Sequence, residues 1–263
     1  MIRLTRGINL TINSKTGFIE TGPTRQIIIP QPNMTLWVTL GGSPDRETGF
    51  VVNVATIKKV FQENLKKHPF APENNMEILN WAKQIVHLNF PEFICLKTQL
   101  DINDSLSLAL IEQEPQTMMQ LTTKYELAAA HKLWNNDWDA KRNFEEFGKC
   151  SNPAGHGHNY LLEITLEGRP DAQTQQIISM AKLNKIVNEV IIEPFDHKNL
   201  SKDVPEFKNV IPTVENMTKI FWELLAHHFG SVRLARVAVW ETPKTYAEYF
   251  GPTDGPLRYS ENV

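Results

Sequence analysis

The chain has 263 residues, of which 41% are hydrophobic and 22% are charged, and its formal net charge is −3. This composition is typical of a globular protein with one large or two small domains, and it excludes an overall basic surface from which nucleic-acid binding could be argued. No apolar run approaches the ~18 residues of a membrane span, the first residues lack an apolar leader, and the two cysteines lie far apart. We therefore expect a cytoplasmic protein without a disulfide framework.

In the first half of the chain, the sequence predicts strands, then two helices, then strands again. Alternating apolar residues and β-forming residues predict strands within 3–12, 33–45 and 93–111. Apolar residues spaced three and four positions apart predict helices at 54–65 and 76–88.

The second half repeats this order. Segments typical of strands at 118–130, 159–171 and 232–250 flank helical patterns at 180–191 and 212–225, and the last of these begins with a Pro-Thr signal. The sequence NYLLEITLEGRPD of the second half aligns without a gap with NMTLWVTLGGSPD of the first, at an offset of 126 residues. The chain is therefore predicted to be a tandem repeat.

The order of the elements predicts the fold class. Two strands, two helices and two strands in each copy indicate α+β units, each with an antiparallel sheet and both helices on one face. The join near 114–117 gives domains at 1–116 and 117–263. Such sheets have free edge strands, which proteins cover by closure or by pairing. We therefore expect a homo-oligomer that associates through strand edges.

Three histidines of the second half have the spacing of a metal site. His156 and His158 are two residues apart at the start of a predicted strand, so they point to the same face. His131 ends the preceding strand, which would pair antiparallel with the next one and bring a third imidazole beside the pair. Three neutral histidines with an open fourth position match a catalytic Zn²⁺ site. The alternative is a pair of half-exposed strand histidines without a ligand.

Other reactive residues also lie in the second half. Cys150 is in a loop-like stretch beside Lys149 and the expected dication, which makes it a candidate low-pKa thiolate. A lone cysteine is more often a small buried hydrophobe, and this is our interpretation of Cys95. Asp196 and His197 are a candidate acid–base pair, in which the carboxylate fixes the imidazole tautomer. For that dipeptide alone, a surface turn is the stronger interpretation.

Glu241 follows a predicted strand at 237–240, where the backbone leaves the apolar interior. A carboxylate there can accept two parallel hydrogen bonds from a planar donor edge, such as a guanidine-like ring. The simpler alternative is an exposed acid at the end of a strand.

Together, these motifs resemble the 6-pyruvoyl-tetrahydropterin synthase family, which includes the 6-carboxy-tetrahydropterin synthases of queuosine biosynthesis. Over about 121–251, FGKC, NPAGHGHNY, DHKNL, PTVEN and WET occur in the family's order and at its spacings. The resemblance implies that the zinc ligands are His131, His156 and His158. It implies that the proton-transfer residues are Cys150, Asp196 and His197. The pterin-binding residues that it implies are Glu241, Thr213 and Glu215. It also implies the tunnelling fold, in which ββααββ units join into an oligomeric barrel with active sites between subunits.

The activity that the resemblance implies is that of a zinc-dependent lyase of tetrahydrobiopterin biosynthesis. Its substrate would be the pterin 7,8-dihydroneopterin triphosphate, from which triphosphate is eliminated, and no nucleic-acid or membrane partner is expected. One alternative is the 6-carboxy-tetrahydropterin synthase reaction, since that branch uses the same zinc, cysteine and Asp-His groups. A second is a non-catalytic scaffold that binds a pterin or zinc.

The sequence departs from the family pattern in two ways. The first copy keeps the frame but none of the metal or proton-transfer residues, so we interpret it as a degenerate unit that serves assembly. The Thr-Gly turn of the family is present as Thr48-Gly49 in the first copy but is Thr174-Gln175 in the second. We therefore expect the second turn to differ in shape.

Overall fold

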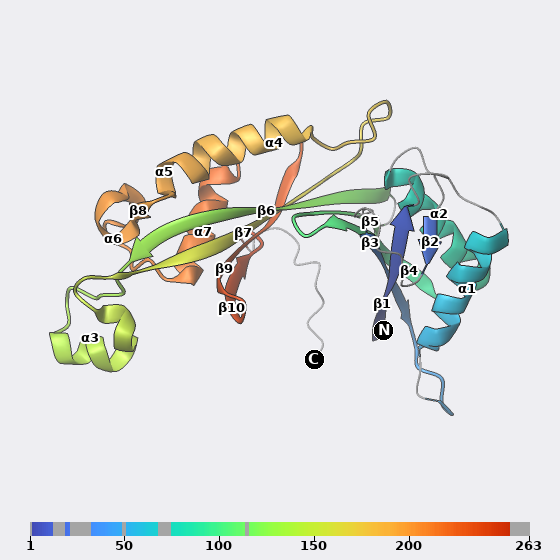
Figure 1. The fold of residues 1–263 in the computed structure, drawn as a ribbon, viewed down its shortest axis with the longest axis horizontal. Helices are drawn as coiled ribbons and strands as arrows, with labels where there is room; N and C mark the ends of the chain where they lie inside the picture. The colour runs from blue at the N-terminus through green and yellow to red at the C-terminus, as the bar shows by residue number, and fades with distance from the viewer. Residues whose placement is uncertain are drawn as a thin grey trace, which may run out of the picture. The chain divides into compact units, whose positions relative to one another are not determined.

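The computed structural model describes residues 2–12, 19–21, 33–48, 51–67, 75–113 and 116–252 (Figure 1). Its contacts divide the protein into two compact units. Unit 1 comprises Met1–Thr122 and Gly168–Ile177, and unit 2 comprises Thr123–Glu167 and Ile178–Val263. Each unit has a β-sheet with helices packed against it, as the α+β class predicts. None of the helices within the described ranges is long and apolar enough to cross a bilayer.

The sheet of unit 1 has the order β2-β1-β3-β4-β5, with antiparallel neighbours throughout. These strands are β1 (Ile2–Ile12), β2 (Ile19–Thr21), β3 (Asn33–Gly42), β4 (Ile94–Asn103) and β5 (Leu106–Gln113). Helices α1 (Val54–Lys67) and α2 (Asn75–Asn89) connect β3 to β4. Alternate residues of β3, such as Leu36 and Val38, are fully buried and share a core with Ile57 and Phe61 of α1, because a strand turns every second side chain to the same face.

Unit 2 contains the strands that position the candidate site. Its strands are β6 (Gln116–His131), β7 (His156–Gly168), β8 (Lys198–Asn199), β9 (Arg233–Thr242) and β10 (Thr245–Tyr249). They have the order β6-β7-β9-β10, with the short β8 paired parallel to β6, and the boundary between the units falls inside β6. The strand β9 is antiparallel to both of its neighbours, β7 and β10.

The longer helices of unit 2 begin at capping residues. The helices of this unit are α3 (Ala140–Phe147), α4 (Met180–Val187), α5 (Glu193–Phe195), α6 (Leu200–Asp203) and α7 (Val214–Leu225). Asp139, Ser179 and Thr213 each accept a hydrogen bond from a backbone N–H of the first turn of α3, α4 and α7. The apolar stripe of α7, with Met217 and Phe221, is fully buried.

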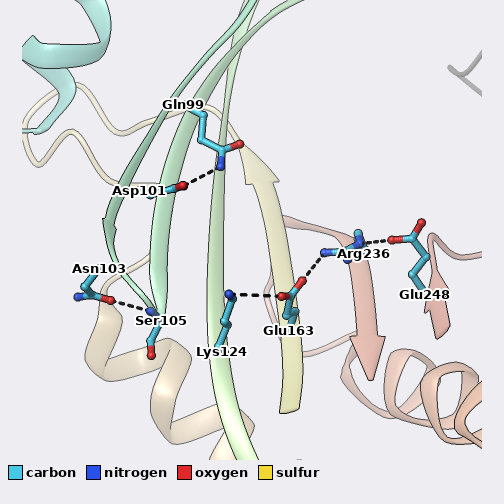
Figure 2. A network of polar contacts seen from close by, with 8 residues as sticks. All are labelled: Gln99, Asp101, Asn103, Ser105, Lys124, Glu163, Arg236 and Glu248. Atoms are coloured by element: carbon cyan, nitrogen blue, oxygen red, sulfur yellow. Dashed lines mark hydrogen bonds and ion pairs between the residues drawn. The ribbon is translucent and has the colours of Figure 1, made fainter. Parts of the chain in front are cut away.

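A row of alternating charges crosses the four main strands of unit 2 (Figure 2). Glu163 of β7 accepts from Arg236 Nη1 at 2.9 Å and lies 3.6 Å from Lys124 Nζ, while Arg236 Nε donates to Glu248 at 2.7 Å. Burial alone would lower the pKa of Arg236, but its bonds to Glu248 and Glu163 outweigh burial and raise it. Each charge in the row has a neighbour of opposite sign, which offsets the free-energy cost of removing that charge from water.

The structure corrects the prediction in two elements. The predicted loop that holds Cys150 contains a 3₁₀ turn (Gly148–Ser151). The helix α3 directly before it, which begins after the cap Asp139, was not predicted from the sequence. The predicted helix at 180–191 is α4 followed by a π-helical turn (Asn188–Ile192), which leads directly into α5. The shifted hydrogen-bond pattern ends four residues before Asp196.

The turns after β3 and β7 share one hydrogen-bond pattern. Asp45 Oδ1 accepts from the backbone N–H groups two and three residues later and from the Thr48 hydroxyl, and Asp171 Oδ1 does the same with Thr174. The hydrogen bonds of the two turns therefore do not show the difference in shape that the sequence predicted. Gln175 adopts the left-handed conformation (φ 58°) that glycine adopts without strain, whereas the glycine of the first turn lies outside the described residues.

Candidate metal centre

His131, His156 and His158 meet at one end of the sheet of unit 2. One nitrogen from each ring lies within 4.8 Å of the others, and the Nε2 atoms of His131 and His156 are 3.1 Å apart. The last residue of β6 and the first residues of β7 come together because these strands are neighbours in the sheet. The strand period then turns His156 and His158 to the same face.

The surroundings of His131 leave its Nε2 free for a ligand. Its Nδ1–H donates to the carbonyl of Pro212 at 2.8 Å, and the hydroxyl of the buried Tyr160 lies 3.3 Å from the same nitrogen. An imidazole that donates from Nδ1 keeps a lone pair on Nε2. Gly155 is required beside it, because a Cβ there would lie 2.7 Å from the His131 carbonyl oxygen and the backbone has φ 71°.

The donor set fits a divalent metal. Within the described part of the protein, the buried Nε2 of His158 makes no hydrogen bond, which is costly unless another group binds it. Burial is the largest influence on His131 and His158, and it lowers the pKa of both, against a smaller opposing effect of Glu241. The rings are therefore neutral near pH 7, which is the form that binds Zn²⁺.

Glu241, near the end of β9, lies beside the triad. Its Oε1 is 3.6 Å from His131 Nε2 and 3.4 Å from His158 Nε2. The sequence predicted a carboxylate at a strand end, but the contact with the histidines depends on the β7–β9 register, in which Leu161 lies opposite Trp240. No sequence pattern gives that register.

Cys150 lies in the 3₁₀ turn that follows α3. The turn is tied to the end of β6, because Leu133 N–H donates to the Cys150 carbonyl at 2.9 Å. Burial, and secondarily the charge of Glu241, raises the pKa of the Cys150 thiol, so the expected low-pKa thiolate is not found in the protein alone. Lys149, on which that expectation partly rested, is exposed, and solvent screens its charge.

Cys95 is partly buried and packs as a hydrophobic side chain. It lies on β4 and contacts the core of unit 1. Burial, and then the charge of Glu112, raises the pKa of its thiol to about 11. A thiol of this kind is inert at neutral pH.

Asp196 and His197 form a hydrogen-bonded pair docked on β6. Asp196 Oδ2 accepts from His197 Nδ1 at 2.7 Å, while its Oδ1 accepts from the Ala128 N–H at 2.8 Å. Burial would raise the pKa of Asp196, but these hydrogen bonds together hold it below its ordinary value. The side chain of His197 is 81% exposed, and no contact among the described residues joins the pair to the triad or to Cys150.

Thr213 and Glu215 lie where α7 begins. Thr213 is the N-cap and accepts from Asn216 N–H at 3.3 Å, directly after the Pro212 carbonyl that holds His131. Glu215 is exposed in the first turn, where a negative charge complements the helix dipole. The structure thus connects the start of α7 to the triad through Pro212, and it places neither side chain against a histidine in the described contacts.

Comparison with known proteins agrees with the order of these motifs. The family model described as 6-pyruvoyl tetrahydropterin synthase matches residues 120–252, just over half of the 263 residues. The human 6-pyruvoyl tetrahydrobiopterin synthase is 37% identical over 132 residues, which cover 50% of this chain and 91% of that protein. The 6-carboxy-5,6,7,8-tetrahydropterin synthase of Aquifex aeolicus is 25% identical over 160 residues, covering 49% of this chain and 96% of that one.

One solved structure resembles the fold of nearly the whole protein. The uricase from Arthrobacter globiformis aligns over 95% of this chain and 92% of its own, with a TM-score of 0.50 and 7% identity. At that identity the likeness concerns the fold alone. The family match and the human relative, in contrast, cover the strands and helices that position the triad. The chain belongs to the 6-pyruvoyl tetrahydropterin synthase family.

Proposed function

We propose that the protein is a zinc-dependent 6-pyruvoyl-tetrahydropterin synthase-like lyase, which acts on 7,8-dihydroneopterin triphosphate and eliminates triphosphate. The observation that carries the proposal is the convergence of three imidazole nitrogens, one of them buried without a hydrogen bond among the described residues. The 37% identity to the human enzyme supports the pyruvoyl reaction.

His131, His156 and His158 would hold the zinc ion. When bound, the metal supplies Lewis acidity to the side-chain hydroxyls of the substrate. Glu241, next to the triad, would accept two parallel hydrogen bonds from the amino-pyrimidine edge of the pterin ring. Thr213 and Glu215 belong to the segment that would help to line the pocket.

The proton-transfer residues have different tasks in this proposal. Cys150 is the general base for the C–H protons of the substrate's side chain. Because its pKa is raised in the protein alone, the thiol must lose its proton before it can act. Asp196 holds the Nδ1 proton of His197, so the exposed His197 can exchange a proton through Nε2. This exposure is compatible with a site completed by another copy of the protein.

Product analysis tests the reaction directly. Metal-replete protein is incubated with 7,8-dihydroneopterin triphosphate, and the products are followed by mass spectrometry. We expect release of triphosphate and formation of a 6-pyruvoyl pterin. Release of acetaldehyde would instead identify the 6-carboxy reaction, which the Aquifex relative supports at lower identity.

The alternative of a non-catalytic pterin or zinc scaffold rests on the first copy, which lacks the reactive groups. In the main proposal, residues 1–116 are a degenerate unit that serves assembly of a homo-oligomeric barrel through strand edges. Light scattering of the full-length protein tests the assembly: a mass of several subunits is expected, and a monomer at micromolar concentration would contradict it.

A further inference from the structure

The backbone at the end of β6 connects the histidine triad to the proposed base. His131, a member of the triad, is the last residue of β6. Two residues later, the Leu133 N–H donates to the carbonyl of Cys150 at 2.9 Å. The position of Cys150 relative to His131 therefore depends on the backbone of the one residue between His131 and Leu133, which is Lys132.

The same strand holds the Asp196–His197 pair three residues before His131. The Ala128 N–H donates to Asp196 Oδ1 at 2.8 Å, and the Ala128 carbonyl accepts from the His197 N–H at 2.6 Å. His197 has a φ of 57°, a left-handed conformation that costs free energy in a residue other than glycine, so these contacts hold it against its local preference. The next two residues form β8, which runs parallel to β6. The chain thus follows β6 from the pair toward His131.

Ser201 follows β8 and makes two hydrogen bonds with Lys132. Its Oγ accepts from the Lys132 N–H at 2.9 Å and donates to the Lys132 carbonyl at 3.1 Å, so one hydroxyl binds both backbone groups of that residue. Ser201 is itself held in place, because its N–H donates to Asn199 Oδ1 at 3.1 Å and the neighbouring Leu200 is fully buried. A hydroxyl anchored in this way restricts the backbone that it binds.

We propose that Ser201 is a positioning residue, which fixes the backbone of Lys132. It thereby keeps the metal ligand, the proposed base and the acid–base pair at the spacing that the reaction requires. This inference rests on the proposed function, because that function defines the reaction. The ring of His131 is held separately by the Pro212 carbonyl. Loss of the Ser201 hydroxyl should therefore slow the chemical step and leave metal binding intact.

The first experiment compares the steady-state kinetics of four zinc-loaded proteins with 7,8-dihydroneopterin triphosphate: the parent, Ser201→Ala, Ser201→Thr and a control, Ser179→Ala. Ser179 also lies in unit 2, and its hydroxyl also accepts from a backbone N–H, that of Lys182 in α4. We expect Ser201→Ala to lower kcat by about tenfold to 100-fold, with little change in KM or zinc content. Ser201→Thr keeps the hydroxyl and should restore most of kcat, and the control should match the parent.

Three outcomes of this experiment would overturn the proposal. A parent-like kcat in Ser201→Ala would show that the reaction does not depend on the hydroxyl. Equal losses of kcat in Ser201→Ala and Ser179→Ala would show a general effect of lost stability. A Ser201→Thr variant as slow as Ser201→Ala would show that a hydroxyl at this position is not sufficient. A circular dichroism spectrum equal to that of the parent verifies that each variant is folded.

The second experiment tests the positioning without turnover. Amide hydrogen exchange of the full-length protein is followed by mass spectrometry in the peptides that contain residues 128–133 and Cys150. We expect faster exchange of both peptides in Ser201→Ala and parent-like exchange in Ser201→Thr and Ser179→Ala. Unchanged exchange in Ser201→Ala would overturn the proposal. A parent that does not convert the substrate would contradict the proposed function instead, and the exchange rates would still decide whether Ser201 holds this backbone.

Discussion

At the residue scale, Cys150, the proposed general base, is distinct from the three candidate metal ligands. Its turn contacts Leu133 through the backbone, and its thiol is not one of the three ligands of the triad. We expect Cys150→Ala to keep the zinc affinity of the parent and to lose turnover by at least about 100-fold, the contribution of a positioned general base. Metal analysis and product formation measure the two effects, and turnover at the parent rate would show that Cys150 is not the base.

The Asp196–His197 pair predicts a pH dependence of stability. Since the pKa of Asp196 is held below its ordinary value of 3.8, its charged form stabilises the fold above that pH, and the contribution is lost as the pH falls through the lowered pKa. Asp196→Asn should therefore be less stable than the parent at pH 7, and the gap should close below about pH 3.8. Urea unfolding from pH 7 to 3 measures it, and a gap that widens toward acid would contradict the account.

Gln175 offers a test of backbone strain. A non-glycine residue in the left-handed region costs about 1 kcal/mol or more in backbone strain. Glycine removes this strain, but it also makes the unfolded chain more flexible, which offsets part of the gain in stability. Gln175→Gly, at φ 58°, should raise the free energy of unfolding by up to about 1 kcal/mol. Gln173→Gly, in the same turn but without a positive φ, should not. Urea denaturation compares the two, and equal effects would refute the strain.

At the scale of elements, the helix α3 depends on one buried amide. Asn143 is fully buried, donates to the carbonyls of Asn135, Trp138 and Asp139, and accepts from the Asn135 N–H. Its removal leaves the Asn135 N–H and the Trp138 carbonyl, both on partly buried residues, without this partner, whereas the carbonyls of Asn135 and Asp139 keep backbone hydrogen bonds. Asn143→Ala should therefore lower the free energy of unfolding by about 2–4 kcal/mol. The substitution Asn136→Ala, at a neighbouring asparagine, is the control, and equal unfolding curves for both variants would contradict this role.

The elements also show what sequence patterns can and cannot predict. Helical and strand periods identified α1, α2, α7 and the strands of the triad, because these elements bury one face against a core. The two-residue strand β8 was missed, since it exists only by pairing with Ala129 and Ala130 of β6. The proximity of Glu241 to the triad was missed for the same reason: it follows from tertiary register and not from local pattern.

At the scale of the whole molecule, the candidate chemistry is confined to one of the two units. The triad, Cys150, Glu241 and the Asp196–His197 pair all lie in unit 2, within the range of the family match. The order of motifs along the sequence predicted that the reactive residues lie in the second half of the chain. The sequence did not predict that Gly168–Ile177 would group with unit 1, because that grouping depends on long-range contacts.

The proposed reaction depends on one zinc ion held by three histidines, and the metal content of the purified protein measures this without turnover. Purified protein is loaded with zinc, dialysed and analysed for metal, beside His158→Ala and the control His87→Ala on α2 of unit 1. We expect about one zinc per subunit in the parent and the control, and a large loss in His158→Ala with an unchanged circular dichroism spectrum. A parent that retains no zinc, or a His158→Ala variant that retains as much as the parent, would contradict the account.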